Sequence, residues 1–266
     1  MSNFTDFIGG GGGSASFPTF FLHKSATWVP PQDGNIMIHV IGAGGSGSGS
    51  TADNNVESGA AGGYCRKNSL AVTTSGSFTV TIGAGGASVI GAVGAGTAGG
   101  VTSMAGTGLS LLRSFGGAGG ALAANAYTAG GPATGGDVNY TGGRGGYQKG
   151  GGAVGLTGTG NDGSAGSNYF ASYGANCDTI GDFYSSSLGQ LSGSVGGTAQ
   201  AFSQQNGNGN AGPLAGAGSS VISTSPALGA SHASIGGGGG WTQNSYVDYI
   251  FSGRGGEGCV VIQYIP

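Results

Sequence analysis

The chain has 266 residues, of which 66 are glycine, 7 are proline and only 6% are charged, and its net charge is −3. Seven Lys and Arg residues give no basic footprint for nucleic acid, and no apolar run reaches the ~18 residues that a membrane span needs. Disordered chains are usually polar and charged, whereas this chain is 37% hydrophobic. We therefore expect a folded protein without nucleic-acid binding or membrane insertion, with a flexible glycine linker as the alternative.

The first 16 residues combine an apolar head with a glycine spacer. Phe4, Phe7 and Ile8 precede the run Gly9–Gly13, a layout that fits an anchor peptide joined by a hinge. A disordered terminus is the alternative interpretation. The segment has neither a basic n-region nor an apolar h-region, so we expect no signal peptide.

Two strands are predicted between Phe17 and Val40. The first, Phe17–Val29, is rich in β-forming residues and ends at Pro30 and Pro31. A turn at residues 32–35 follows, with glycine where a positive φ is easy. The second strand places Ile36, Ile38 and Val40 on one face, alternating with Met37, His39 and Ile41.

Further strands follow at intervals along the chain. Tyr64–Val72 and residues 77–83 flank a turn at Thr73–Gly76, and a short strand is predicted at Leu109–Phe115. The last strand should return to the sheet begun near the N-terminus, because otherwise both ends would leave unpaired edges. In the strand at residues 77–83, Phe78, Val80 and Ile82 are predicted to share one face. In the last strand, Val260, Ile262 and Tyr264 are predicted to do the same.

The stretch 142–166 repeats glycine with a period of three. Glycine occupies positions 143 and 146, then 152, 155 and 158, then 160, 163 and 166. This is the period of the polyproline II helix, which has no internal hydrogen bonds and must pair its amides with neighbouring chains. We therefore predict several glycine helices packed side by side. We do not expect collagen, because it needs an unbroken glycine phase and much proline.

Two ligand-binding motifs are matched only superficially. Residues 42–47 read G-x-G-x-x-G, but no helix-like pattern follows to place its N-terminus at a pyrophosphate. Asn161–Gly163 resembles one calcium-binding nonapeptide, yet such sites need tandem copies. We expect neither a nucleotide nor a metal site.

The three cysteines lie far apart, at Cys65, Cys177 and Cys259, without a C-x-x-C pair. Buried free thiols are the expected state. A Cys65–Cys259 bridge is possible only if the second and last sheet segments are neighbours.

The order of these segments resembles a known family. An aromatic-rich strand ending TWVPP is followed by NIMIHVIGAGGSG, GGYC and SFTVTIGAGG, and the chain closes with GRGGEGCVVIQYIP. This pattern is similar to the glycine-rich domain of tailed-bacteriophage tail and fibre proteins, and to the glycine-rich region of anaplastic lymphoma kinase receptors. The resemblance covers residues 17–266. It implies an all-β fold with almost no α-helix: a β-sandwich-like body from the N- and C-terminal strands, with an inserted bundle of polyproline II helices.

On this basis the chain divides into an anchor peptide with its spacer at 1–16 and a single glycine-rich domain at 17–266. Within the domain, residues 17–120 are mainly β-strands, 121–240 form the polyglycine II bundle and its loops, and 241–266 form the closing strands.

Two segments rich in aromatic residues are candidate binding loops. Tyr with Ser, Gly and Asn is typical of adaptable binding surfaces, and aromatic rings with Asp or Asn also suit sugars. A capping role over the end of the bundle is equally open, and the residues of the second segment could instead belong to a sheet. The receptor-binding candidates are Tyr169, Phe170, Tyr173, Asp178, Asp182 and Tyr184 in the first segment, and Trp241 and Tyr246 in the second.

No catalytic motif is present. The histidines, His23, His39 and His232, are scattered, and there is no G-x-S-x-G, H-E-x-x-H or P-loop. We expect no enzyme activity and no cofactor.

The resemblance implies a virion protein made in the host cytoplasm, above all a receptor-binding tail-fibre or tail-tip protein (an adhesin). It would present loops to a bacterial surface glycan or outer-membrane protein, and attach to other virion tail proteins through Phe4, Phe7 and Ile8. We expect a trimer, because tail fibres are usually trimeric. A purely structural virion component and a polysaccharide depolymerase are the alternatives.

Overall fold

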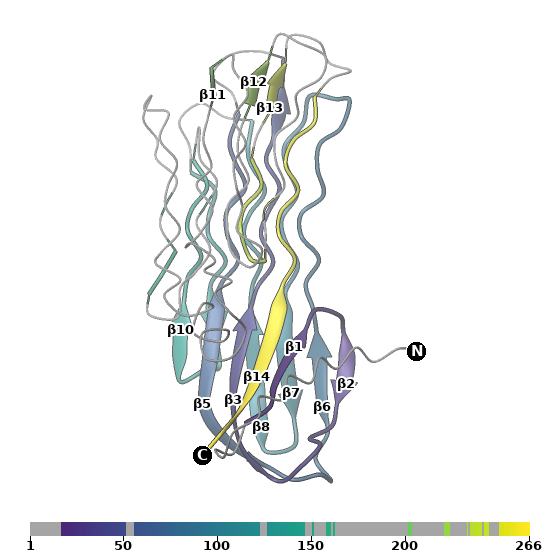
Figure 1. Ribbon diagram of the computed structural model, residues 1–266. Helices are drawn as coiled ribbons and strands as arrows, with labels where there is room; N and C mark the ends of the chain where they lie inside the picture. Colours follow the sequence, from purple (N-terminus) through teal and green to yellow (C-terminus); the bar gives the residue numbers. More distant parts are fainter. Residues whose placement is uncertain are drawn as a thin grey trace, which may run out of the picture.

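The computed structural model describes residues 17–51, 56–122, 127–146, 151, 158–160, 162, 202–203, 221–223, 233, 235–240, 242–244 and 250–266. This part of the chain contains strands and extended segments and no helix. Two antiparallel sheets form a sandwich, and long glycine segments extend from one end of it (Figure 1).

Three sheets organise the strands. The first has the order β1 (Thr19–Leu22), β14 (Cys259–Ile265), β3 (Gly34–Ile41), β5 (Tyr64–Val72) and β10 (Val138–Tyr140). The second has the order β2 (Ala26–Trp28), β6 (Phe78–Thr81), β7 (Thr102–Gly106), β8 (Leu109–Ser114) and β9 (Ala133–Thr134). A small parallel sheet has the order β11 (Phe202–Ser203), β12 (Val221–Ser223), β13 (Thr242–Asn244) and β4 (Gly49–Ser50).

The hydrophobic core lies between the two antiparallel sheets. Alternate residues of each strand point into it because side chains alternate across a strand. The predicted faces are confirmed: Ile36, Ile38 and Val40 of β3, Phe78 and Val80 of β6, and Val260, Ile262 and Tyr264 of β14 all belong to this core, and Ile82 packs against it. The last strand also returns to the first sheet as predicted, between β1 and β3.

The strand predicted at Phe17–Val29 is wrong as a single element. It is divided into β1, which pairs with β14, and β2, which pairs with β6 in the other sheet. The chain therefore crosses between the sheets at residues 23–25, so one stretch of β-forming residues supplies an edge strand to each sheet. The turn at Thr73–Gly76 also joins the two sheets, because β5 and β6 lie in different ones.

Both described cysteines are buried free thiols. Cys65 belongs to the core between the sheets, whereas Cys259 lies in a second cluster with Ile41, Tyr64 and Val261. The two thiols therefore occupy opposite faces of the first sheet, and a Cys65–Cys259 bridge does not form. Burial raises the pKa of the Cys259 thiol to about 12, so the thiol stays protonated.

The glycine segments pack as an array of polyproline II helices. Residues 42–49, the central segment, donate their amides in strict rotation to three neighbours. The first neighbour receives bonds from Gly42, Gly45 and Ser48, the second from Ala43, Ser46 and Gly49, and the third from Gly44 and Gly47. Their acceptors lie in residues 57–63, 94–100 and 253–256 respectively. A three-residue rotation of donors, with every bond going to another segment, is the signature of this helix.

The central segment also accepts amide bonds from other neighbours, Gly86, Gly117, Gly120 and Gly239. Six segments thus surround it. Residues 57–63 repeat the pattern, since their amides rotate among residues 143–146, 236–239 and 115–118. The predicted three-residue phase is confirmed at positions 143 and 146, whose carbonyls accept from Ala61 and Ser58.

Glycine is required in the array because the backbones approach too closely for side chains. A Cβ on Gly44 would overlap the carbonyl oxygen of Gly237, and one on Gly59 would overlap that of Gly45. Alanine also occurs in the array, and Ala43 and Ala60 are fully buried there. Serine contributes hydrogen bonds there: the Ser46 hydroxyl oxygen accepts from the Thr97 amide at 2.8 Å.

The array also includes parts of residues 17–120, the region that we predicted to be mainly β-strands. Segments 42–49, 57–63, 83–86, 94–100 and 115–120 all belong to it. The G-x-G-x-x-G match at residues 42–47 lies in the central segment, so its glycines serve close backbone packing.

Replacing Gly44 by Ala should destabilise the protein by about 3 kcal/mol, because the methyl group has no room beside Gly237. Gly158 is the matched control, since a Cβ there meets nothing within 4 Å, and Gly158→Ala should change stability by less than about 0.5 kcal/mol. Urea unfolding of both variants measures the difference. Equal midpoints would contradict the close-packed array.

Candidate functional site

The two ends of the molecule differ in structure: one is the sandwich, and the other holds the connections between glycine segments. Strands β3, β6 and β8 each run directly into a glycine segment, and β5, β7 and β14 each begin where one returns. The end of the array away from the sandwich, the distal end, therefore carries the connections between segments (Figure 1). The sandwich forms the proximal end. There the Tyr264 amide donates to the Pro18 carbonyl, so the start of β1 lies beside the end of β14.

The small parallel sheet lies at the distal end (Figure 1). Its first strand in sequence, β4, continues the central segment, and β13 pairs with it in parallel. β12 and β11 then add to β13 in the same direction. Three segments far apart in the sequence thus meet on the central segment and run away from the sandwich.

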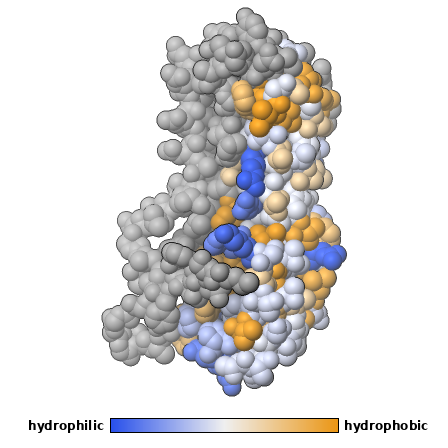
Figure 2. Space-filling model, turned by 90° about the vertical axis from the view of Figure 1, so that its right-hand side faces the viewer, coloured by the Kyte–Doolittle hydropathy of each residue, from blue (hydrophilic) through white to orange (hydrophobic). Residues whose placement is uncertain are grey.

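An apolar patch is exposed at the distal end. Ile90, Val93 and Phe251 are 66%, 47% and 40% exposed, and Figure 2 shows hydrophobic residues gathered at this end of the face in view. The backbone beneath is fixed: Ile90 and Phe251 form an antiparallel bridge, and the Gly91 amide donates to the Ile250 carbonyl at 2.9 Å. Large apolar groups held in the open by a rigid backbone are a feature of interaction surfaces.

A second exposed cluster lies along the array, around Arg144, whose neighbours Gly143 and Gly146 pair with Ala61 and Ser58. The Asp162 carboxylate accepts from the Arg144 amide at 2.8 Å and from its guanidinium Nε and Nη2 at 2.9 and 2.7 Å. The guanidinium carbon lies 4.6 Å from the Tyr127 ring centroid, a cation–π arrangement. Hydrogen bonds from Arg144 lower the pKa of Asp162 against the opposing effect of burial. The cluster fixes residue 162 to the array and engages the carboxylate of the Asn161–Gly163 motif.

The receptor-binding candidates Tyr169, Phe170, Tyr173, Asp178, Asp182, Tyr184, Trp241 and Tyr246 lie outside the described residues, as do the attachment candidates Phe4, Phe7 and Ile8. The described neighbours of the second aromatic segment are informative. Gly240, β13 and Ile250 flank Trp241 and Tyr246 in sequence, and β13 belongs to the distal parallel sheet.

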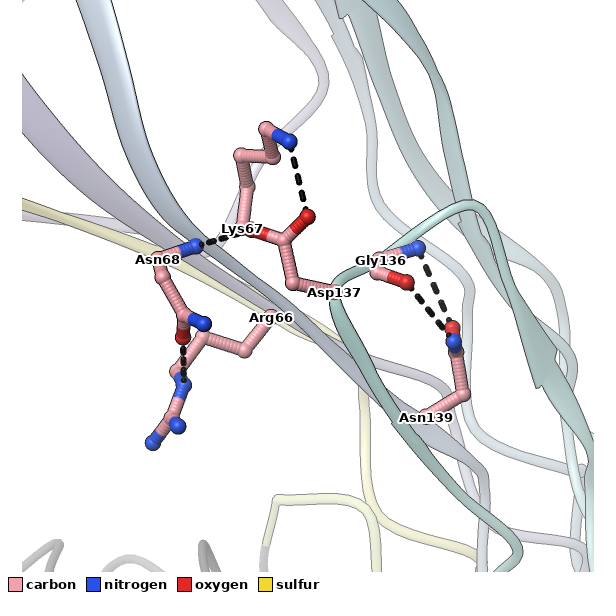
Figure 3. A network of polar contacts seen from close by, with 6 residues as sticks. All are labelled: Arg66, Lys67, Asn68, Gly136, Asp137 and Asn139. Atoms are coloured by element: carbon pink, nitrogen blue, oxygen red, sulfur yellow. Dashed lines mark hydrogen bonds and ion pairs between the residues drawn. The ribbon is translucent and has the colours of Figure 1, made fainter.

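A polar network on the side of the sandwich has a structural role (Figure 3). The pairing of β3 with β5 shifts register between Ile36 and Ile38, opposite residues 67–70. The amide of Asn68 falls in this bulge and donates to the Asp137 carboxylate at 2.8 Å, while the Lys67 ammonium donates to the other oxygen at 2.8 Å. Asp137 therefore satisfies a backbone group that the bulge releases. Further hydrogen bonds complete the network: the Arg66 guanidinium donates to the Asn68 side chain, and the Asn139 side chain bonds to both the amide and the carbonyl of Gly136.

His39 is buried on the outer face of the first sheet, where the sequence predicted a face residue. Its Nδ1 lies 2.7 Å from the Tyr64 hydroxyl, and the Tyr64 ring stacks on Tyr140 with centroids 6.1 Å apart. Burial, reinforced by the positive charge of Arg66, lowers the pKa of His39 to about 3. A neutral, enclosed imidazole of this kind serves packing.

Neither a metal cluster nor a membrane-crossing helix is found in the described part of the chain. No three His, Cys, Asp or Glu residues gather there closely enough to hold an ion. No helix there is long and apolar enough to span a bilayer.

Sequence reasoning missed Ile90, Val93 and the Tyr127–Arg144–Asp162 cluster as surface features. The available signal was their position: Ile90 and Val93 lie between two glycine segments, 83–86 and 94–100, that pair with the same central segment. Residues at the midpoint of such an excursion must lie at the distal end.

Comparison with known proteins assigns a family to almost the whole chain. The family model described as a glycine-rich domain matches residues 19–265. No curated protein matches the sequence.

Folding stability should fall as the pH drops from 6.5 towards 3, in part because of His39. The unfolded chain binds a proton to this imidazole at its ordinary pKa of 6.5, whereas the folded chain resists protonation down to about 3. The loss is about 1.4 kcal/mol per pH unit within this window. Urea unfolding at pH 7 and pH 5 should show a smaller loss for His39→Gln than for the wild type. Identical losses would exclude His39 as a source of the pH dependence.

Proposed function

The chain belongs to the glycine-rich domain family, and we propose that it is a bacteriophage receptor-binding protein of the tail fibre or tail tip. It acts without catalysis, as an adhesin. The glycine array holds the distal connections out from the sandwich, and these contact a glycan or an outer-membrane protein of the host. The phage assignment follows from the resemblance of the segment order to tail and fibre proteins.

The polarity of the molecule is the observation that carries the proposal. Phe17, the first described residue, precedes β1, whose Thr19 pairs with Gln263 near the end of β14. The head at residues 1–16 thus joins the chain at the proximal end, opposite the parallel sheet and the apolar patch. Phe17 and Val29 are themselves exposed, at 42% and 53%. A chain whose head is joined at the proximal end and whose connections lie at the distal end is suited to bridge a particle and a cell.

The array also explains how the distal connections can vary. Its segments satisfy one another's backbone groups, so the scaffold does not depend on the residues that join them. Each contact with a host surface is weak, and several copies on one particle supply avidity. We propose a homotrimer as the assembled form, located in the tail of the virion.

A purely structural virion component is the second candidate. The observation that favours it is the extent of the cross-linking, since the central segment is bonded to six neighbours, which makes the array stiff. In this role the distal connections would be spacers.

In the adhesin role, the head attaches the protein to the particle and the distal end binds the host, so the two activities can be tested separately. Replacing Phe4, Phe7 and Ile8 by Ser should remove the protein from particles, because the apolar anchor is lost. The purified variant should still compete with phage for host cells as well as the wild-type chain does. Particle content is measured by immunoblot and competition by adsorption assay. A variant that no longer competes, or that remains in particles, would contradict the proposed polarity.

Replacing Tyr173, Tyr184 and Trp241 together by Ala should reduce adsorption at least tenfold, because each ring offers a large rigid contact. Leu111→Ala is the control, since Leu111 is 44% exposed on the outer face of the second sheet. Circular dichroism and thermal unfolding verify the fold of both. Unchanged adsorption by a folded triple variant would favour the structural role.

A further inference from the structure

The glycine array has an unfinished side along the connection from β6 to β7. Residues 83–87 lead away from the sandwich and residues 94–100 lead back to it, and Figure 1 shows the segment that leaves β6 at the side of the array. On their inner side both segments bond to the central segment. Their outer side, which we name the open edge, carries four exposed alanines: Ala84, Ala87, Ala95 and Ala98.

The returning segment uses only two of the three directions in which its amides point. The amides of Gly94 and Thr97 donate to the central segment. Those of Gly96 and Gly99 donate to residues 115–120. In the central segment all three directions are used, so the third direction of the returning segment marks a boundary of the array.

This third direction belongs to Ala95 and Ala98. Among the described residues, neither the amide nor the carbonyl of these two residues forms a hydrogen bond. The amides of Ala84 and Ala87 have no partner among the described residues either. Because the residues of each pair are three apart, their backbone groups recur about every 9.3 Å along a polyproline II helix. The open edge is therefore the counterpart, in this array, of the unpaired edge of a sheet.

The open edge has none of the features that protect the edge of a sheet. Natural edge strands are blunted by charged side chains, prolines or bulges. Here the sequence has no charged residue between Lys67 and Arg113, and no proline between Pro31 and Pro132. Nothing in this stretch opposes the approach of another extended segment.

Apolar side chains are exposed at both ends of the open edge. Ile90 and Val93 lie in the connection between the two segments, and Val101, directly before β7, is 37% exposed. Their burial would favour association through the hydrophobic effect, while the backbone groups between them would set the register.

We propose that the open edge binds a second copy of this chain, so that the glycine segments of neighbouring subunits continue one array. The inference rests on the proposed homotrimer and names the surface through which its subunits meet. The occupant must be an extended segment with the same three-residue spacing and small side chains, and the open edge of another copy has both. The fully buried Ala43 and Ala60 show that alanine is compatible with such packing. An uncharged edge also meets its copy without like-charge repulsion.

The test uses the full-length protein and measures its mass and its amide exchange. Sedimentation equilibrium at several concentrations should give a mass three times the 25.2 kDa of one chain. In the assembled protein the amides of Ala95 and Ala98 should exchange slowly with solvent, because a neighbouring subunit occupies them. On dilution to the monomer they should exchange at the rate of unprotected amides.

The variant Ala95→Asp with Ala98→Asp places carboxylates from both subunits in the contact. The association constant should fall at least about 100-fold, and the slow exchange should be lost. Ala129→Asp with Thr141→Asp is the matched control, because both positions are exposed and lie in segments whose bonds go to other neighbours. The control should assemble like the wild type, and circular dichroism verifies the fold of both variants.

A protein that is monomeric at every concentration would overturn this inference and the homotrimer, but it would leave the adhesin proposal intact if it still competed with phage for host cells. Slow exchange at Ala95 and Ala98 in the monomer would also overturn it, because another part of the same chain would then cover the edge. Assembly that persists in the Ala95→Asp, Ala98→Asp variant would exclude the open edge as the interface. A dimer that this variant dissociates would support the open edge and overturn only the homotrimer. Assembly through the open edge without competition for host cells would overturn only the adhesin proposal.

Discussion

Backbone hydrogen bonding between polyproline II segments is the constraint on which this structure depends. Such a helix cannot satisfy its own amides and carbonyls, so every buried group must find a partner on a neighbouring segment. The central segment meets this requirement by rotating its donors among three neighbours and accepting from others. Because the bonds point in all directions around each segment, the array grows in two dimensions, whereas a sheet grows in one.

The sandwich and the array stabilise each other. The sandwich fixes where each segment starts: Gly42 follows β3 and Gly63 precedes β5, and these two residues share a hydrogen bond. Hydrophobic burial between the sheets sets the register at the base, and the three-residue repeat carries that register outward. The array thereby extends a fixed geometry to a distal end that has no hydrophobic core of its own among the described residues. Function can therefore reside in its connections.

Local patterns predicted much of the sandwich. The alternation of Ile36, Ile38 and Val40 indicated the core face of β3, and Val260, Ile262 and Tyr264 indicated that of β14, because side-chain direction in a strand follows the two-residue period. The division of Phe17–Val29 into two strands could not be read in this way. β-forming residues report only that a segment is extended, and which sheet it joins is decided by partners distant in the sequence.

The candidate site was harder to predict. The aromatic segments drew attention by composition, whereas Ile90, Val93 and the Tyr127–Arg144 pair have unremarkable neighbours in sequence and acquire their position from the array. The cysteines illustrate the same limit: only the pairing of Val40 with Cys65 and of Ile41 with Cys259 showed that the thiols lie on opposite faces.

The sequence by itself determined that glycine helices would pack without internal hydrogen bonds, because a three-residue glycine period is compatible with little else. It also determined the core faces of the strands and the scarcity of positive charge. Only the tertiary structure decided which segment would be central and which residues would meet at the distal end. Glycine has no side chain to distinguish one neighbour from another, and only a few side chains such as Ser46 make specific contacts. The partners of each segment are therefore selected mainly by the strands to which it is joined.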